Sequence, residues 1–302
     1  MSLAIPQVSA ARQAAAYLEL TKPRITALVV FTGVPALLLA AHGLPAPGVL
    51  AGTLLGIIAS SASASCFNMY FDMDIDALMR RTASRPLPAG ILPPSSALGL
   101  GFVLAGLSWV VLIMSANLLA ALIAMASIFY YAIVYTVWLK RRTPQNIVIG
   151  GAAGASAPLI AWAAVTGGVG LPAVLLSGIV FLWTPPHFWA LSLYRREDYE
   201  RAGLPMLPVS HGEPETRRQI LLYSLVLVPV TLGLWPLGFA GPVYTVPAAV
   251  LGGAFIYYAA RLKRSGDTNH AIRLFRYSIA YLFLLYLLLT ADAVMRIASH
   301  AW

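Results

Sequence analysis

The sequence has 302 residues, of which 59% are hydrophobic and only 10% are charged, whereas soluble domains carry about 25% charged residues. This composition excludes an ordinary soluble globular protein and indicates a protein that resides in lipid. The formal net charge of +9 would suit a nucleic acid, but the basic residues lie in short links between apolar segments, so we attribute them to membrane topology and expect no nucleic-acid partner.

Segment 1–24 contains Arg12, Glu19 and no apolar core, so we expect a cytoplasmic segment there rather than a cleaved signal peptide. From residue 25 onward, apolar runs repeatedly reach the roughly 20 residues that cross a bilayer as a helix. Helix is required because a backbone in lipid must satisfy its own hydrogen bonds. We predict an all-α integral membrane protein with a single polytopic domain over 1–302 and a central cavity. The nine predicted spans are 25–42, 48–70, 95–114, 116–138, 145–164, 171–193, 219–238, 242–262 and 272–295.

With nine spans, every basic residue except Arg296 falls on one side of the membrane. The positive-inside rule then predicts a cell (inner) membrane protein with its N-terminus in the cytoplasm and its C-terminus outside. Two cytoplasmic loops, 71–94 and 194–218, are long and polar and follow the second and sixth helices. This spacing predicts two four-helix halves plus a ninth helix, with an active site formed by the two loops.

The richest polar stretch follows the second predicted helix. Asn68, Asp72 and Asp76 recur every four residues, which places them along one helical face. Aligned acceptors repel one another unless cations intervene, and Mg²⁺ prefers carboxylate oxygens and bridges to substrate phosphates. We therefore predict a Mg²⁺-bound diphosphate here, with Arg80, Arg81 and Arg85 neutralising the remaining phosphate charge. The alternative is a solvated acidic helix end paired with its own arginines.

The second polar loop carries Asp198, with Glu197 beside it. Asp198 is predicted to hold a second metal opposite the first motif. The alternative, which the sequence supports equally, is that Asp198 is an ordinary loop residue paired with Arg195 or Arg196. His187 lies several residues inside the sixth helix, where it is suited to coordinating iron, accepting a proton or bonding a neighbour.

Tyr131 and Tyr135 lie toward the cytoplasmic end of the fourth predicted helix, ahead of Lys140. An interfacial aromatic belt explains them most simply. Aromatic faces also stabilise cations, including a carbocation, which is the functional alternative.

At these residues the chain resembles the UbiA superfamily of intramembrane prenyltransferases, whose mark is an Asn-x-x-x-Asp-x-x-x-Asp motif after the second helix and a second acidic motif after the sixth. Asn68, Asp72 and Asp76 match the first motif. Quinone-pathway members place several aspartates in the second motif, whereas here Asp198 is the clear acid and His187 lies upstream, which suits a heme-binding branch. Further residues resemble that branch over nearly the whole chain, at 20–24, 140–146, 184–189, 198–208 and 274–278.

The resemblance implies transfer of the farnesyl group of farnesyl diphosphate to a vinyl group of heme B, with addition of water and release of diphosphate, giving heme O. Mg²⁺ is the implied cofactor, heme B is a substrate, and a downstream heme A synthase is an implied partner. We predict catalytic roles for Asn68, Asp72, Asp76, Asp198 and His187, the first four of these also binding metal. Diphosphate or heme binding is predicted for Arg24, Arg81, Arg85, Lys140, Arg195, Tyr131 and Tyr135.

Three other functions fit parts of the pattern. One is a prenyltransferase acting on an aromatic quinone precursor. A second is a membrane transporter, but a transport path places ionisable groups near the midplane, and here Asp292, near the outer end of the ninth helix, is the only partial exception. A third, a heme-binding assembly factor, would need His187 but not the acidic motif.

Overall fold

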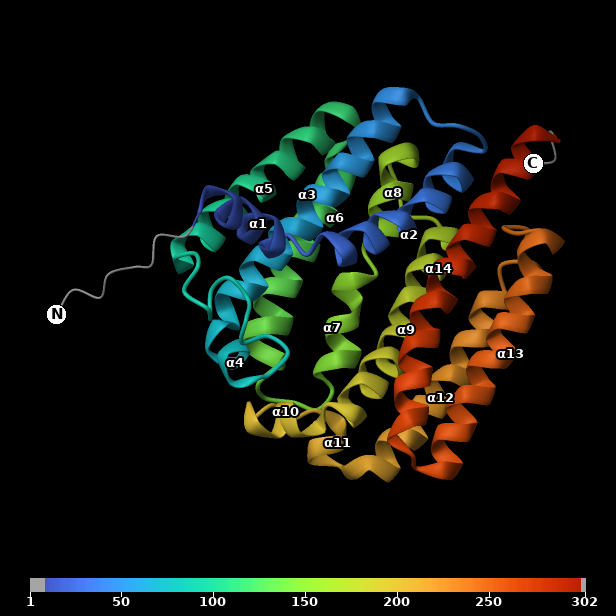
Figure 1. Ribbon diagram of the computed structural model, residues 1–302. Helices are drawn as coiled ribbons and strands as arrows, with labels where there is room; N and C mark the ends of the chain where they lie inside the picture. The colour runs from blue at the N-terminus through green and yellow to red at the C-terminus, as the bar shows by residue number, and fades with distance from the viewer. Residues whose placement is uncertain (1–8, 300–302) are drawn as a thin grey trace.

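The computed structural model describes residues 9–299, and helices are its only regular elements over that range (Figure 1). The predictions for residues 1–8 and for the last residues, 300–302, lie outside the described part of the chain. The helices are, in order, α1 (Ala10–Leu20), α2 (Pro23–Ala41), α3 (Pro47–Phe71), α4 (Met73–Leu78), α5 (Pro94–Ser115), α6 (Leu118–Phe129), η1 (Tyr130–Leu139), α7 (Asn146–Gly154), α8 (Ala157–Thr166), α9 (Leu171–Tyr194), α10 (Arg196–Arg201), α11 (Leu207–Ser210), α12 (Gly212–Leu232), α13 (Pro242–Ser265) and α14 (Thr268–Ala298).

The membrane architecture matches the predicted one. Within residues 9–299, eight helical stretches are long and apolar enough to span a bilayer. A ninth, α12, has charged residues in its first two turns but is apolar thereafter, and it packs against α9 and α13. The chain is therefore a multi-pass helical membrane protein, and predicted and observed bounds differ by only a few residues for most spans.

The span predicted at 145–164 is not one helix. It consists of α7 and α8, separated at Ala155 and Ser156. Pro158 lies in the first turn of α8 and has no backbone N–H to donate to the carbonyl four residues earlier, at Gly154, so a continuous helix is interrupted there.

Helix α1 was not expected, because segment 1–24 has no apolar run. It is amphipathic, and Ala16 and Leu20 are buried against Cys66 and Met69 of α3. After Thr21, the C-cap of α1, Lys22 adopts the left-handed conformation with φ of 46° and separates α1 from α2, which starts at Pro23.

The two polar loops meet at one end of the molecule, where α4, α10 and α11 lie together (Figure 1). A small apolar cluster joins them, with Ile75 and Met79 from the first loop and Tyr199, Leu204 and Met206 from the second. The second loop is shorter than the predicted 194–218, because α12 already begins at Gly212. This packing brings the two acidic motifs to the same end of the helical bundle.

Asp292 is buried at the opposite end of α14, with 3% of its surface exposed. Its Oδ2 accepts a hydrogen bond of 2.8 Å from the Gly241 backbone N–H, and Oδ1 accepts one of 3.3 Å from Tyr244 N–H. Asp292 thus caps the N-terminus of α13, where a carboxylate is favoured by the orphan N–H groups and the helix dipole. A structural role accounts for this buried charge.

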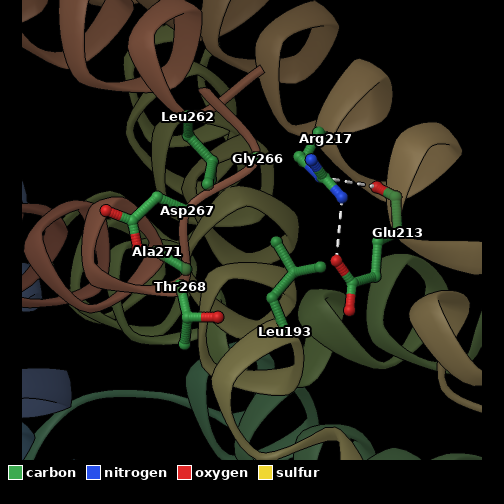
Figure 2. A pocket seen from close by; sticks show the side chains of 8 residues that line it. All are labelled: Leu193, Glu213, Arg217, Leu262, Gly266, Asp267, Thr268 and Ala271. Atoms are coloured by element: carbon green, nitrogen blue, oxygen red, sulfur yellow. Dashed lines mark hydrogen bonds and ion pairs between the residues drawn. The ribbon is translucent and has the colours of Figure 1, made fainter. Parts of the chain in front are cut away.

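A small pocket lies where α9, α12 and the α13–α14 turn meet (Figure 2). Arg217 lines it and donates to the Glu213 side chain at 2.8 Å. Gly266 has φ of +64° and its missing Cβ makes room for the Arg217 guanidinium. The remaining volume is about 10 Å³, which is no more than a water needs, so this pocket joins helices and does not bind a substrate.

Candidate active site

The acidic motif lies at the junction of α3 and α4. Asn68, Asp72 and Asp76 are 4%, 0% and 2% exposed. Helical hydrogen bonds continue through the junction, from the N–H of Asp72 to the Asn68 carbonyl and from that of Asp76 to the Asp72 carbonyl. The Asn68 Nδ2 also donates to Asp72 Oδ2 at 2.7 Å. All three therefore point into the protein from one face, as their spacing predicts.

Two cations from other elements pair with the buried carboxylates. Lys140, at the end of η1, lies 2.6 Å from Asp72 Oδ2, and Arg85, in the loop after α4, lies 2.6 Å from Asp76 Oδ2. The lysine and arginine side chains are only 16% and 17% exposed. Both residues were expected to bind phosphate, and their amino and guanidinium groups lie directly beside the acidic motif.

Lys22, which was not among the predicted site residues, is a further cation of the site. Its Nζ donates to Asn68 Oδ1 at 2.7 Å, whereas Arg24, which was selected, lies exposed in the first turn of α2. Lys22 adopts φ 46° and ψ 61°, a conformation that costs a non-glycine residue about 1–3 kcal/mol and is concentrated at functional sites. The sequence feature that could have indicated Lys22 is Pro23. A proline favours the first position of a helix, so the residue before it, Lys22, is the N-cap at the membrane edge.

Two carboxylate oxygens in the two acidic motifs are fully buried and have no hydrogen-bond partner, Asp72 Oδ1 and Asp198 Oδ2. Leaving a buried charged oxygen unpaired is costly, so these atoms are suited to a cation. Asp198 is 4% exposed, and its other oxygen has only a 3.5 Å contact with Arg201.

The donor set suits Mg²⁺. Among the described residues, no three acidic, histidine or cysteine side chains gather closely enough to enclose a metal by themselves. Mg²⁺ seldom requires such a cage, because it keeps several waters and binds through one or two carboxylates plus substrate phosphates.

Asp74 lies outside this site. Its side chain is 61% exposed and pairs with Arg141 at 2.7 Å, and this hydrogen bond holds the pKa of the Asp74 carboxyl below its usual value. Arg141 also donates to the Phe71 carbonyl, so the pair ties the start of α4 to the end of η1.

Arg81 and Arg195 are both exposed, and within the described chain neither forms an ion pair. Arg195 lies over the Tyr194 ring, with its Cζ 5.5 Å from the ring centre. Burial raises the pKa of Tyr199, and the charge of Arg81 acts in the opposite direction, so Arg81 lies near the second loop. Both arginines are open to an anion at the membrane edge.

Tyr131 and Tyr135 lie on η1, a π-helix that continues α6. Their rings stack with centroids 5.4 Å apart. Thr136 connects them to the acidic motif, since its hydroxyl accepts from Asn68 Nδ2 at 3.1 Å and donates to the Tyr131 carbonyl at 2.7 Å. Gly150 of α7 has no side chain, and a Cβ there would overlap the Tyr135 ring. π-Helical segments are frequent at functional sites. This one holds the Tyr131 and Tyr135 rings near the carboxylates of the acidic motif.

His187 is buried in α9, between the rings of Trp183 and Phe275. It lies seven residues before the end of α9, about 10 Å further into the bundle, and it makes no contact with the acidic motif. His187 therefore lies apart from the predicted residues around the carboxylates.

The model of the UbiA prenyltransferase family matches residues 29–288. The chain belongs to this family. Among UbiA relatives, the protoheme IX farnesyltransferase of Brucella anthropi is 48% identical over 290 residues, covering 95% of this chain and 93% of the relative. The protoheme IX farnesyltransferase of Symbiobacterium thermophilum is 49% identical over 278 residues, covering 91% and 93%.

Solved structures share the UbiA fold at much lower identity. A digeranylgeranylglyceryl phosphate synthase structure matches with a TM-score of 0.78 and 20% identity, covering 94% of this chain and 99% of that one. A UbiA homologue from Archaeoglobus fulgidus, bound to DMAPP and Mg²⁺, matches with a TM-score of 0.63 and 17% identity, covering 93% and 99%. These likenesses confirm the all-helical fold.

Proposed function

We propose that this UbiA protein is an intramembrane prenyltransferase that converts heme B to heme O. The bond between C1 of the farnesyl group and the diphosphate oxygen breaks, and C1 bonds to the terminal carbon of a heme vinyl group. A water oxygen bonds to the other vinyl carbon and loses one proton. The products are a hydroxyethylfarnesyl heme and diphosphate, without oxidation or reduction.

One observation carries the choice of substrates. Relatives that are 48% and 49% identical over more than nine-tenths of this chain are protoheme IX farnesyltransferases. This favours heme over the aromatic quinone precursor. The capping role of Asp292 argues against a transporter, because it accounts for the buried charge that lies away from the cytoplasmic end.

The buried polar residues suit the first chemical step. Asp72 would hold Mg²⁺ through its unpaired oxygen, with Asn68 and Asp76 completing the first motif. Asp198 would hold a second Mg²⁺ through its own unpaired oxygen. Bound Mg²⁺ would supply positive charge to the leaving diphosphate. This use of Mg²⁺ is supported by a homologue's structure with DMAPP and Mg²⁺.

Three protein cations surround the same motif, Lys22, Arg85 and Lys140. They keep the acidic residues neutralised inside a largely apolar environment, where unpaired charge is expensive. Their amino and guanidinium groups are placed to donate hydrogen bonds to diphosphate oxygens when substrate binds. Arg81, exposed nearby, adds a fourth positive charge.

The stacked rings of Tyr131 and Tyr135 offer aromatic faces to a positively charged allylic group. Tyr135 is the residue before Thr136, and the Tyr131 carbonyl accepts a hydrogen bond from the Thr136 hydroxyl, which in turn accepts one from Asn68. These links support a position for both rings next to the phosphate end of the site. The surrounding apolar helices exclude water until the carbon–carbon bond has formed.

We infer that the acidic end faces the cytoplasm of a cell (inner) membrane protein, because nearly all basic residues lie at that end. The described chain then begins on the cytoplasmic side and ends outside. One membrane domain contains the whole site, and a heme A synthase that accepts the product is the expected partner.

The proposal is tested by incubating purified protein with heme B, farnesyl diphosphate and Mg²⁺ and determining the mass of the extracted heme. A farnesylated, hydrated product is expected, and omission of Mg²⁺ with EDTA should abolish it. Replacing heme B with an aromatic quinone precursor provides the comparison. A prenylated quinone precursor with unchanged heme would contradict the proposal.

A further inference from the structure

The interface between α9 and α14 contains a histidine whose surroundings differ from those of the acidic site. His187 is 8% exposed, and helices α9 and α14 pack side by side around it (Figure 1). Within the described part of the chain, the only hydrogen-bond partner of its ring is the uncharged Ser278 of α14, whose Oγ lies 2.7 Å from Nδ1.

Both faces of the imidazole are covered by aromatic rings. Trp183 stacks on one face at 4.3 Å between centroids and 19° between planes. Phe275 stacks on the other at 4.6 Å and 25°. Phe188 adds an edge contact at 5.2 Å. The ring therefore cannot tilt or swing without breaking two stacking contacts.

The hydrogen bonds of Ser278 determine which imidazole nitrogen carries the proton. The Ser278 hydroxyl donates its single proton to the Phe275 carbonyl at 2.7 Å. Its oxygen can then only accept from His187, so the Nδ1 position is the N–H donor. The neutral imidazole consequently has its free lone pair on Nε2.

Nε2 has no hydrogen-bond partner among residues 9–299, and it is not one of the fully enclosed unpaired atoms. Part of the small exposed surface of His187 therefore belongs to Nε2. Trp183 further holds the Ser278 segment by donating from Nε1 to the Ser278 carbonyl at 2.7 Å.

We propose that His187 binds the iron of the heme substrate through Nε2 and that Ser278 is a positioning residue that fixes its tautomer and orientation. Metal-ligating histidines typically donate their other ring N–H to a protein acceptor in this way. The inference rests on the proposed function, which supplies heme as the substrate.

The neighbourhood also suits the rest of a heme molecule. From His187 an aromatic path leads toward the cytoplasmic end, because Phe275 contacts the Tyr194 ring at 5.8 Å and Arg195 lies over that ring. Apolar and aromatic side chains favour a flat macrocycle, and an exposed arginine at the membrane edge favours its propionates. Iron ligation would hold the vinyl groups in the bundle at a set depth.

The test compares binding of ferric heme B and of metal-free protoporphyrin IX to purified full-length protein in detergent, followed by absorption and resonance Raman spectroscopy. His187→Phe keeps an aromatic ring in the stack and removes the ligand, and His187→Ala leaves space for added imidazole. His211→Ala is the matched control, because His211 also bonds a serine, Ser210, at 3.1 Å but is exposed. Thermal unfolding checks that each variant is folded.

We expect His187→Phe to lose the histidine-ligated iron spectrum and at least about tenfold in heme affinity, with protoporphyrin affinity unchanged. Imidazole should restore the spectrum in His187→Ala. Ser278→Ala should weaken heme binding roughly 10–100-fold, as removal of an outer partner does at other metal sites. After reduction of the bound heme to the ferrous form, the same variant should show a shifted iron–histidine vibration. His211→Ala should match the unchanged protein.

An unchanged iron spectrum in folded His187→Phe, or equal losses for heme and protoporphyrin, would overturn the ligand assignment. If one of these results is found and the unchanged protein still farnesylates heme, the iron-ligand role of His187 is wrong and the proposed function stands. If the unchanged protein neither binds nor modifies heme, the proposed function fails with it.

Discussion

Replacing Asp72 with Asn tests the central role given to the buried acidic motif. The substitution keeps the shape of the side chain but removes its charge. Asp72 Oδ2 accepts hydrogen bonds from Lys140 at 2.6 Å and Asn68 at 2.7 Å, and Oδ1 is buried without a partner. The variant therefore loses the negative charge beside these two donors and the carboxylate oxygen assigned to Mg²⁺.

The expected loss of stability is moderate. A hydrogen bond to a charged group contributes about 1.5–3 kcal/mol, but the Lys140 side chain is 16% exposed and can move its amino group toward water. We expect the free energy of unfolding to fall by about 1–3 kcal/mol, which a domain stable by roughly 5–15 kcal/mol survives. Loss of one electrostatic stabiliser of a reacting group typically lowers kcat by about 10²–10³-fold, so catalysis should fall far more than folding.

Asp74→Asn is the matched control, since it makes the same chemical change two residues away in an exposed pair. We expect less than about 1 kcal/mol of destabilisation and near-normal turnover. The assay combines mass analysis of farnesylated heme with thermal unfolding in detergent, with and without Mg²⁺ and farnesyl diphosphate. Ligand at 100 times its Kd should stabilise the unchanged protein by about 2.7 kcal/mol and Asp72→Asn much less. Normal turnover by Asp72→Asn, or equal losses in the two variants, would refute the reasoning.

Three other predictions concern packing and pH. Asp292→Ala should lower the free energy of unfolding by about 1–3 kcal/mol, because it leaves the N–H groups of Gly241 and Tyr244 without their acceptor. The kcat of the folded fraction should stay unchanged. Thermal unfolding and a turnover assay measure the two quantities. Gly150→Ala should displace the Tyr135 ring and reduce kcat by at least about tenfold, which corresponds to about 1.4 kcal/mol on the activation barrier. Gly154→Ala is the control and should leave kcat unchanged, because nothing lies within 4 Å of its new Cβ. Equal kcat values for the two variants would contradict the prediction. Since its arginine partner lowers the pKa of Asp74 from the usual 3.8, the pair stabilises the folded state above that pH and loses its contribution as the pH falls. The difference in unfolding free energy between unchanged protein and Asp74→Asn should shrink on acidification, from a value below about 1 kcal/mol.

Much of the architecture was predictable, because hydropathy reports directly on burial in lipid. The span predicted at 48–70 is helix α3, Pro47–Phe71, and the spacing of Asn68, Asp72 and Asp76 implied the common face that the structure has. Local signals were weaker where a span is interrupted. The division of 145–164 into α7 and α8 depends on Pro158, whose effect competes with the uniform hydrophobicity of the segment.

Selection of cations was the least predictable part of the site. Lys22 and Arg24 are two residues apart with similar charge, yet only Lys22 reaches Asn68. The choice depends on the left-handed backbone of Lys22 and on how α2 packs beside α3, which no local pattern contains. The tautomer of His187 was equally unpredictable from the sequence, because it depends on the hydroxyl of Ser278, which is 91 residues away in the chain.

The sequence alone determined that the chain spans a membrane, which end carries the charge and which carboxylates share a face, because each depends on hydrophobicity or helical period within one segment. Only the tertiary structure decided which lysine and arginine neutralise those carboxylates, that Asp292 caps α13, and that Ser278 holds His187. The physical reason is that a hydrogen bond between segments depends on their relative placement, and helix packing sets that placement through contacts spread over the whole chain.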